Sequence, residues 1–169
     1  SVSVMQLFGK LCYTNVFYIT ILLKEESAMV QLIVGKKGKG KTKYILDKVN
    51  TAVRSASGDI VYLDKSAKHM LELNNKIRLI DVSVYPLKDY NEFVGFICGI
   101  ISQNRDIEQM YLDGFLKLTK LEDNKDKVDD CIEQLEQIST MFHVDFVISM
   151  SMDKEELSAD MQDKILLAL

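Results

Sequence analysis

The chain has 169 residues and a mass of 19.3 kDa, with 47% hydrophobic and 27% charged residues. These values predict one globular domain with a full core. The formal net charge is −4 and the pI is about 5.2, which argues against a surface that coats nucleic acid. Three widely spaced cysteines form no CxxC pair, so the sequence favours a reducing, cytoplasmic location over a disulfide framework.

Residues 1–28 differ in character from the rest of the chain. Val16–Leu23 is the one nearly continuous apolar run, and it is too short to span a bilayer. Lys24-Glu25-Glu26 can be encoded as AAG-GAG-GAA, a bacterial ribosome-binding sequence, and Met29 follows at a suitable distance. We therefore expect residues 1–28 to be a translated leader and residues 29–169 to form the domain. The alternatives are an edge strand or a membrane-surface anchor.

A phosphate-binding loop of the form GxxxxGK[ST] follows the apolar run Met29–Val34. Its residues are Gly35, Lys36, Lys37, Gly38, Lys39, Gly40, Lys41 and Thr42. Glycines let the backbone wrap around an anion with its N–H groups pointing inward, and the helix that follows adds its positive dipole end. Lys41 is expected to reach the β- and γ-phosphates of ATP, and the Thr42 hydroxyl to ligate Mg²⁺. The loop therefore predicts a nucleoside triphosphate site.

Strand and helix patterns alternate from Met29 onward. We predict strands at Met29–Val34, Asp59–Leu63, Lys76–Val82, Ile107–Leu112 and Val144–Met150. The predicted helices are Lys41–Val53, Tyr90–Ser102, Lys125–Ile138 and Glu155–Leu167. This order favours a three-layer α/β fold of the P-loop NTPase type, with a mainly parallel five-stranded sheet and helices on both faces.

Two predicted strands end in aspartate at the edge of the sheet where open α/β folds bind ligands. Asp113 ends Met110–Leu112 and is the candidate Mg²⁺ ligand, since a break rather than a helix is expected to follow it. Asp64 ends Val61–Leu63 and is expected to face the nucleotide and to assist catalysis. The alternative for either residue is that it caps the next helix.

The residue after Asp113 is Gly114, where many hydrolysing members of this superfamily carry a glutamate that orients the attacking water. We therefore expect slow hydrolysis. The last predicted strand ends near Ser149 and Ser151, which are candidates for sensing the γ-phosphate. The alternative is that Ser151 or Asp153 caps a helix.

Several segments resemble a family of small single-domain P-loop proteins from Firmicutes, often labelled twitching-motility (pilus-retraction) ATPases. The resemblance extends from Met29 to about Leu166. It rests on Met29–Thr42, Asp59–Asp64, Phe93–Ile100, Tyr111–Gly114, Val144–Ser149 and Asp153–Leu157. It implies ATP binding through Gly35–Thr42. Lys36 gives a second resemblance, to the cell-division and partition ATPases, in which a lysine at this position reaches the partner's nucleotide across a homodimer; Lys37 stands where that family has glycine.

Three functions are consistent with these residues. The first is a slow Mg²⁺-dependent ATPase of the additional-strand P-loop type, or a nucleotide-gated switch that signals to an unknown protein partner. The second is a nucleotide-sensing scaffold that does not hydrolyse ATP. The third is a small-molecule kinase, which needs an arginine lid that the scattered Arg54, Arg78 and Arg105 do not form. No NKxD motif follows the loop, so adenine is the expected base, and no membrane or nucleic-acid partner is expected.

Overall fold

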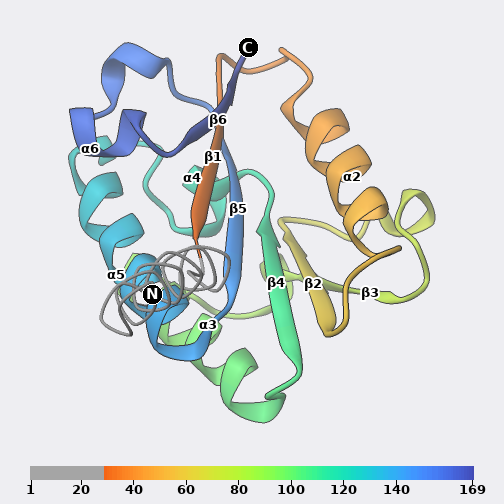
Figure 1. The fold of residues 1–169 in the computed structure, drawn as a ribbon. Coiled ribbons are helices and arrows are strands. Elements are labelled where there is room, and N and C mark those ends of the chain that lie inside the picture. The colour runs from red at the N-terminus through yellow and green to blue at the C-terminus, as the bar shows by residue number, and fades with distance from the viewer. Residues whose placement is uncertain (1–28) are drawn as a thin grey trace, which may run out of the picture.

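A computed structural model of the chain describes residues 29–169, and the predicted leader lies outside them. Six parallel strands form one sheet in the order β3-β2-β4-β5-β1-β6 (Figure 1). The strands are β1 Val30–Val34, β2 Asp59–Asp64, β3 Ile77–Asp81, β4 Ile107–Leu112, β5 Asp145–Met150 and β6 Ile165–Ala168. Five of them lie within two residues of their predicted bounds, and the sixth was not predicted.

Helices cover both faces of the sheet, as predicted. Figure 1 shows α2 on one side of the sheet and α3 and α5 on the other. The longer helices are α2 Lys41–Ala52, α3 Tyr90–Gln103 and α5 Val128–Phe142; the short ones are α4 Phe115–Leu118 and α6 Ala159–Gln162. Two separate apolar clusters fill the space on the two faces. The molecule is therefore a three-layer α/β domain.

The sequence pattern explains why the central strands are buried. β2, β4 and β5 are largely apolar runs, as expected for parallel strands that helices cover on both faces. Helix α3 buries Phe93, Ile97 and Ile100 against one face, and the Asp89 side chain caps its first turn by accepting from the Glu92 N–H at 2.9 Å.

The predicted helix Glu155–Leu167 is wrong, and so is the count of five strands. A turn at Lys154–Glu156 and the four-residue α6 precede β6, which pairs in parallel with β1. The Leu169 N–H donates to the Val34 carbonyl at 3.0 Å. Pairing with β1 gives the apolar residues after Lys164 backbone partners that a helix would have supplied locally, and it covers one edge of β1.

The carboxyl ends of β1, β2, β4 and β5 meet at one edge of the sheet. Gly35 follows β1, Asp64 ends β2, Asp113 follows β4 and Ser151 follows β5. Strand β5 lies between β1 and β4. None of the helices within residues 29–169 combines the length and apolar character needed to span a bilayer.

Candidate functional site

The loop Gly35–Thr42 connects β1 to α2 through three glycines with positive φ. Gly35 has φ +142° and Gly40, which precedes the first turn of α2, has φ +90°, a region that side-chain-bearing residues rarely adopt. A Cβ atom on Gly35 would also collide with the carbonyl of Leu169, the residue that follows β6. The first glycine of the motif is therefore required both by the backbone and by the neighbouring strand.

The Lys41 side chain lies inside this loop. Its Nζ donates to the carbonyls of Gly35 at 2.6 Å and Lys36 at 2.7 Å, and the residue is 8% exposed. Burial lowers the pKa of Lys41, and the nearby carboxylates of Asp113 and Asp153 partly oppose this effect. The loop thus folds around an ammonium group at the place where the motif predicts phosphate.

Asp113 is the most heavily hydrogen-bonded carboxylate of the site. The Thr42 hydroxyl donates to its Oδ1 at 3.3 Å, the Ser149 hydroxyl donates to the same oxygen, and the Tyr62 hydroxyl donates to Oδ2 at 3.1 Å. Ser149 also accepts from the Gly114 N–H at 2.9 Å. These contacts join four elements that are distant in sequence around one carboxylate.

One expectation about Asp113 is wrong. A helix, α4, begins at Phe115, so the residue is followed by one glycine and then a helical turn rather than by a break. Gly114 adopts φ +74° as the N-cap of α4, and the Asp113 side chain makes no cap bond there. The carboxylate is therefore directed to the site, and the capping alternative does not describe it.

Asp64 differs from Asp113 although it lies at the end of the neighbouring strand. Its Oδ1 accepts the Lys65 N–H at 2.6 Å, and the next helical turn begins only at Met70, with His69 as its N-cap, so the capping alternative is wrong for Asp64 as well. Its Oδ2 is buried and has no hydrogen-bond partner among residues 29–169. Burial raises the pKa of Asp64, and the nearby Asp113 carboxylate raises it further.

His69 joins this group, which the sequence did not predict. Its Nε2 lies 3.9 Å from Asp64 Oδ2, and its Nδ1 lies 2.7 Å from Glu72 Oε1. No residues at metal-ligand spacing surround it in the sequence. The turn after β2 carries His69 back over the sheet edge, and local spacing does not reveal that path.

A cavity of about 530 Å³ opens between these residues. The predicted residues that line it are Lys37, Gly38, Gly40, Lys41, Thr42, Asp64, Asp113, Ser149 and Ser151. Gly35, Lys36 and Lys39 do not line it; Lys36 points to Asp153, with its Nζ 3.5 Å from Oδ2. Further residues on the wall were not predicted: Lys65, Lys68, His69, Gly114, Leu116, Lys117 and Glu122.

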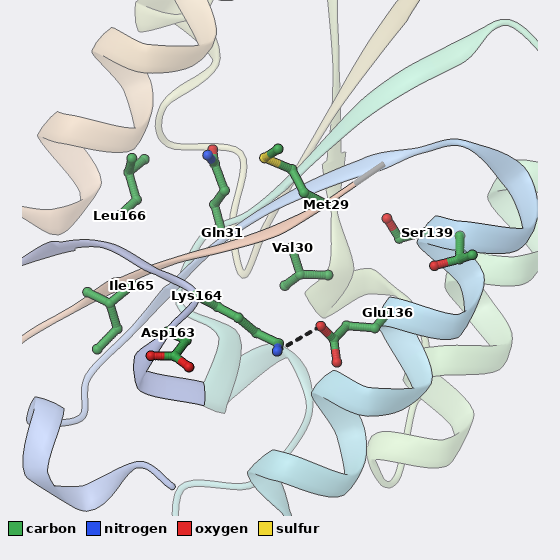
Figure 2. Close-up of a pocket in the computed structure, with 10 residues that line it drawn as sticks. Met29, Val30, Gln31, Glu136, Ser139, Asp163, Lys164, Ile165 and Leu166 are labelled. Atoms are coloured by element: carbon green, nitrogen blue, oxygen red, sulfur yellow. Dashed lines mark ion pairs between the residues drawn. The ribbon is translucent and has the colours of Figure 1, made fainter. Parts of the chain in front are cut away.

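A second cavity of about 440 Å³ lies at the opposite edge of the sheet, beside the amino end of β1 (Figure 2). Figure 2 shows the Lys164 ammonium reaching the Glu136 carboxylate across this cavity, at 3.0 Å. Met29, Gln31 and Ser139 contribute to its wall. None of the predicted site residues lines it, so the chemistry that the sequence indicates is concentrated at the first cavity.

The chain was also compared with known proteins: no protein-family model matches it, and no match was found among the curated proteins. The resemblance to small P-loop proteins therefore stays a prediction.

Proposed function

We propose that this protein binds ATP with Mg²⁺ at the loop Gly35–Thr42 and hydrolyses it slowly, as an ATPase or a nucleotide-gated switch of the additional-strand P-loop type. The triphosphate would lie in the 530 Å³ cavity, with backbone N–H groups as hydrogen-bond donors and Lys41 as its cationic partner. The position of β5 between β1 and β4 supports the additional-strand type.

The observation that carries this proposal is the contact between Thr42 and Asp113. These residues are 71 positions apart, yet the Thr42 hydroxyl lies 3.3 Å from Asp113 Oδ1. The sequence predicted both as Mg²⁺ ligands from two separate patterns. Their contact is what a shared ion would require, because a ligand from the loop and one from the strand must reach the same point.

The donor set fits Mg²⁺. A hydroxyl and a carboxylate are hard oxygen ligands, and Mg²⁺ is usually held by one or two such groups together with phosphate oxygens. When bound, the ion would neutralise charge on the β- and γ-phosphates. Ser149 and Tyr62 hold the Asp113 carboxylate in one orientation from two strands.

Slow turnover follows from the residue after Asp113. Gly114 offers no side chain to orient water, and its backbone N–H is occupied by Ser149. Asp64 is the buried carboxylate on the neighbouring strand and would take the role of orienting water. Because Asp64 lies on β2 and not directly after the metal ligand, we expect it to orient water less effectively than a glutamate at position 114 would.

A scaffold that binds ATP without hydrolysis is the second candidate. It is favoured by the hydrogen bonding of Asp113, whose two oxygens already accept three hydroxyl donors. With Asp113 so occupied, activation of water would depend on Asp64 alone, and the protein would bind ATP without hydrolysing it if Asp64 does not reach the water.

Phosphate release from ATP by the full chain tests the proposal, beside Lys41→Ala and the matched control Lys43→Ala. Lys43 has the same charge but is exposed on α2 outside the cavity wall. We expect Mg²⁺-dependent release that Lys41→Ala abolishes and Lys43→Ala retains. Binding of ATP with release no faster than that of Lys41→Ala would favour the scaffold, and absence of ATP binding would contradict both candidates.

A further inference from the structure

We propose that Asp64, His69 and Asp113 form a binding site for a divalent first-row transition-metal ion, such as Mn²⁺, beside the predicted Mg²⁺ site. Each residue offers one ligand atom, and these atoms lie within 4.8 Å of one another. The residues come from the end of β2, the turn that follows it and the end of β4. The site deepens the proposed function, and any part it takes in ATP chemistry rests on that proposal.

The spacing of the ligand atoms is close to that of a coordination sphere. Ligand bonds of about 2.1 Å place opposite ligands about 4.2 Å apart. The observed limit of 4.8 Å needs side-chain movements of less than about 1 Å to close.

Two of the ligand groups are buried without the partners that such groups normally have. Asp64 is 2% exposed, and its Oδ2 has no hydrogen bond within residues 29–169. The Nε2 atom of His69 is also buried and unpaired in this part of the chain. An unsatisfied buried polar atom destabilises the fold, and here the two lie 3.9 Å apart. A bound cation would satisfy both.

Glu72 prepares the histidine for this role. Its carboxylate lies 2.7 Å from His69 Nδ1 and can only accept, so Nδ1 is the donor, and Nε2, on the side of Asp64, is the nitrogen that a metal ion would take. A carboxylate behind the imidazole is the usual partner of a metal-ligating histidine, where it fixes the tautomer and the ring orientation. Glu72 is thus a positioning residue for the proposed site.

The donor set selects the kind of ion. One imidazole and two carboxylates suit a first-row transition metal better than Mg²⁺ or Ca²⁺, which prefer oxygen ligands alone. The absence of a thiolate from the triad makes Mn²⁺ a suitable probe. Lys65 and Lys68 line the same cavity and oppose cation binding, so phosphate oxygens that neutralise them would strengthen it.

Asp113 would be shared between the two ions. It contacts Thr42 of the predicted Mg²⁺ site and belongs to the triad with Asp64 and His69. Two-metal sites that act on phosphate place their ions about 3.5–4 Å apart, with one ion near the attacking oxygen and one near the leaving oxygen. With the second ion bound, Asp64 would orient water through the metal rather than by direct contact.

Electron paramagnetic resonance with Mn²⁺ and the full chain, without nucleotide, tests this site. The loss of the free-ion signal gives the affinity, and electron spin-echo modulation detects a nitrogen ligand on the bound ion. The chain contains two histidines, His69 and His143. We expect nitrogen coupling that His69→Gln removes and the matched control His143→Asn retains. Asp64→Asn should weaken Mn²⁺ binding at least about tenfold.

Absence of Mn²⁺ binding up to millimolar concentration, or bound Mn²⁺ without nitrogen coupling, would overturn the site. Coupling that persists in His69→Gln would also overturn it. The unmodified chain supplies the coupling measurement, so the test does not depend on how well a variant folds. An ATP-binding isotherm on the same sample separates the two proposals. Nitrogen coupling without ATP binding would support the metal site and contradict the nucleotide function. ATP binding without nitrogen coupling would support the nucleotide function and contradict the metal site.

Discussion

The ends of β4 and β2 carry the same residue type at the same edge of the sheet, but their carboxylates have opposite surroundings. Asp113, after β4, accepts hydrogen bonds from the hydroxyls of Thr42, Ser149 and Tyr62. Asp64, at the end of β2, accepts one backbone N–H and leaves its other oxygen unpaired and buried. Asp113 is thus held in place by the fold, whereas Asp64 is left with capacity for a ligand.

The difference between Asp113 and Asp64 shows that the position of a residue at the sheet edge does not by itself fix its side chain. Parallel strands bring both aspartates to one place, but the side chains on neighbouring strands decide which carboxylate is fixed. One hydroxyl from each of β2, β5 and α2 donates to Asp113. The fold therefore provides one positioned anion and one unsatisfied anion beside it, a pairing suited to a site that holds cations and polyanions together.

Of the substitutions that test the difference between Asp113 and Asp64, removal of the Asp113 carboxylate should have the largest effect. In Asp113→Ala, Mg²⁺-dependent ATP turnover should fall at least about 100-fold, because removal of a ligand costs at least as much as removal of a supporting residue. The variant should also lose stability, since Tyr62 and Ser149 are left without their acceptor. Phosphate release and chemical denaturation measure the two effects. Turnover within tenfold of the unmodified chain would show that Asp113 is not the metal ligand.

Asparagine substitutions should separate the two aspartates by the sign of the change in stability. Asp113→Asn should lower the free energy of unfolding by about 1–3 kcal/mol, because an amide cannot accept all three hydroxyls. Asp64→Asn should raise it, on the order of 1 kcal/mol, because it removes a buried charge beside a like charge. Denaturation at neutral pH with EDTA provides the comparison. Equal losses of unfolding free energy in Asp113→Asn and Asp64→Asn would show that the two carboxylates do not differ in this way.

Tyr62→Phe tests the contribution of one of the three hydroxyls that donate to Asp113. Tyr62 is fully buried, and its hydroxyl donates to Asp113 Oδ2 at 3.1 Å. Loss of this one bond should cost about 1–1.5 kcal/mol of stability, less than the change at Asp113 itself. Tyr111→Phe is the matched control, because the Tyr111 hydroxyl donates to Gln109 outside the site, at 2.9 Å. Turnover that falls equally in both variants would mean that Tyr62 does not position Asp113.

The smallest expected effect is at Asp145, a carboxylate that is partly buried but hydrogen-bonded. Burial raises its pKa, and the Met29 N–H, 2.9 Å from Oδ1, partly opposes the rise. The pKa of Asp145 in the folded state lies above the unfolded-state value near 3.8. The contribution of Asp145 to the free energy of unfolding is therefore fully present below pH 3.8 and is lost as the pH rises through the folded-state pKa. Asp145→Asn should therefore match the unmodified chain at low pH and exceed it at neutral pH, within about 0.5 kcal/mol.

Denaturation curves at several pH values check this prediction. Comparison of Asp145→Asn with Asp64→Asn also separates two costs. Asp145 carries only the cost of burying a carboxylate, whereas Asp64 also carries the cost of a buried oxygen without a hydrogen bond. A variant less stable than the unmodified chain at neutral pH would contradict the sign.

Much of the fold could be predicted because the strands are apolar and the long helices amphipathic. Ile107–Leu112 was predicted to the residue, and the start of α2 was predicted from the GxxxxGK[ST] pattern. Strand β6 was missed because Ile165–Ala168 has no alternation or turn residue that distinguishes a short strand from the end of a helix. Its identity depends on pairing with β1, which is a tertiary contact.

The site was predictable where a motif or a strand end marks it, as for Lys41, Thr42 and Asp113. Tyr62 and His69 were missed for different reasons. Tyr62 looks like an ordinary core residue in a strand, and only the neighbouring Asp113 gives its hydroxyl a role. His69 depends on the path of a turn, and its closeness to Asp64 and Asp113 follows from the pairing of β2 with β4.

A double-mutant cycle on MgATP binding tests the central claim most directly. Isotherms would be measured for the unmodified chain, Thr42→Ala, Asp113→Ala and the double variant, with Mg²⁺ and again with EDTA. If both residues hold one Mg²⁺ at the triphosphate, the cycle should give a coupling energy of about 0.5–3 kcal/mol with Mg²⁺ and a much smaller value with EDTA. Additive losses with Mg²⁺, or no ATP binding by the unmodified chain, would contradict the account.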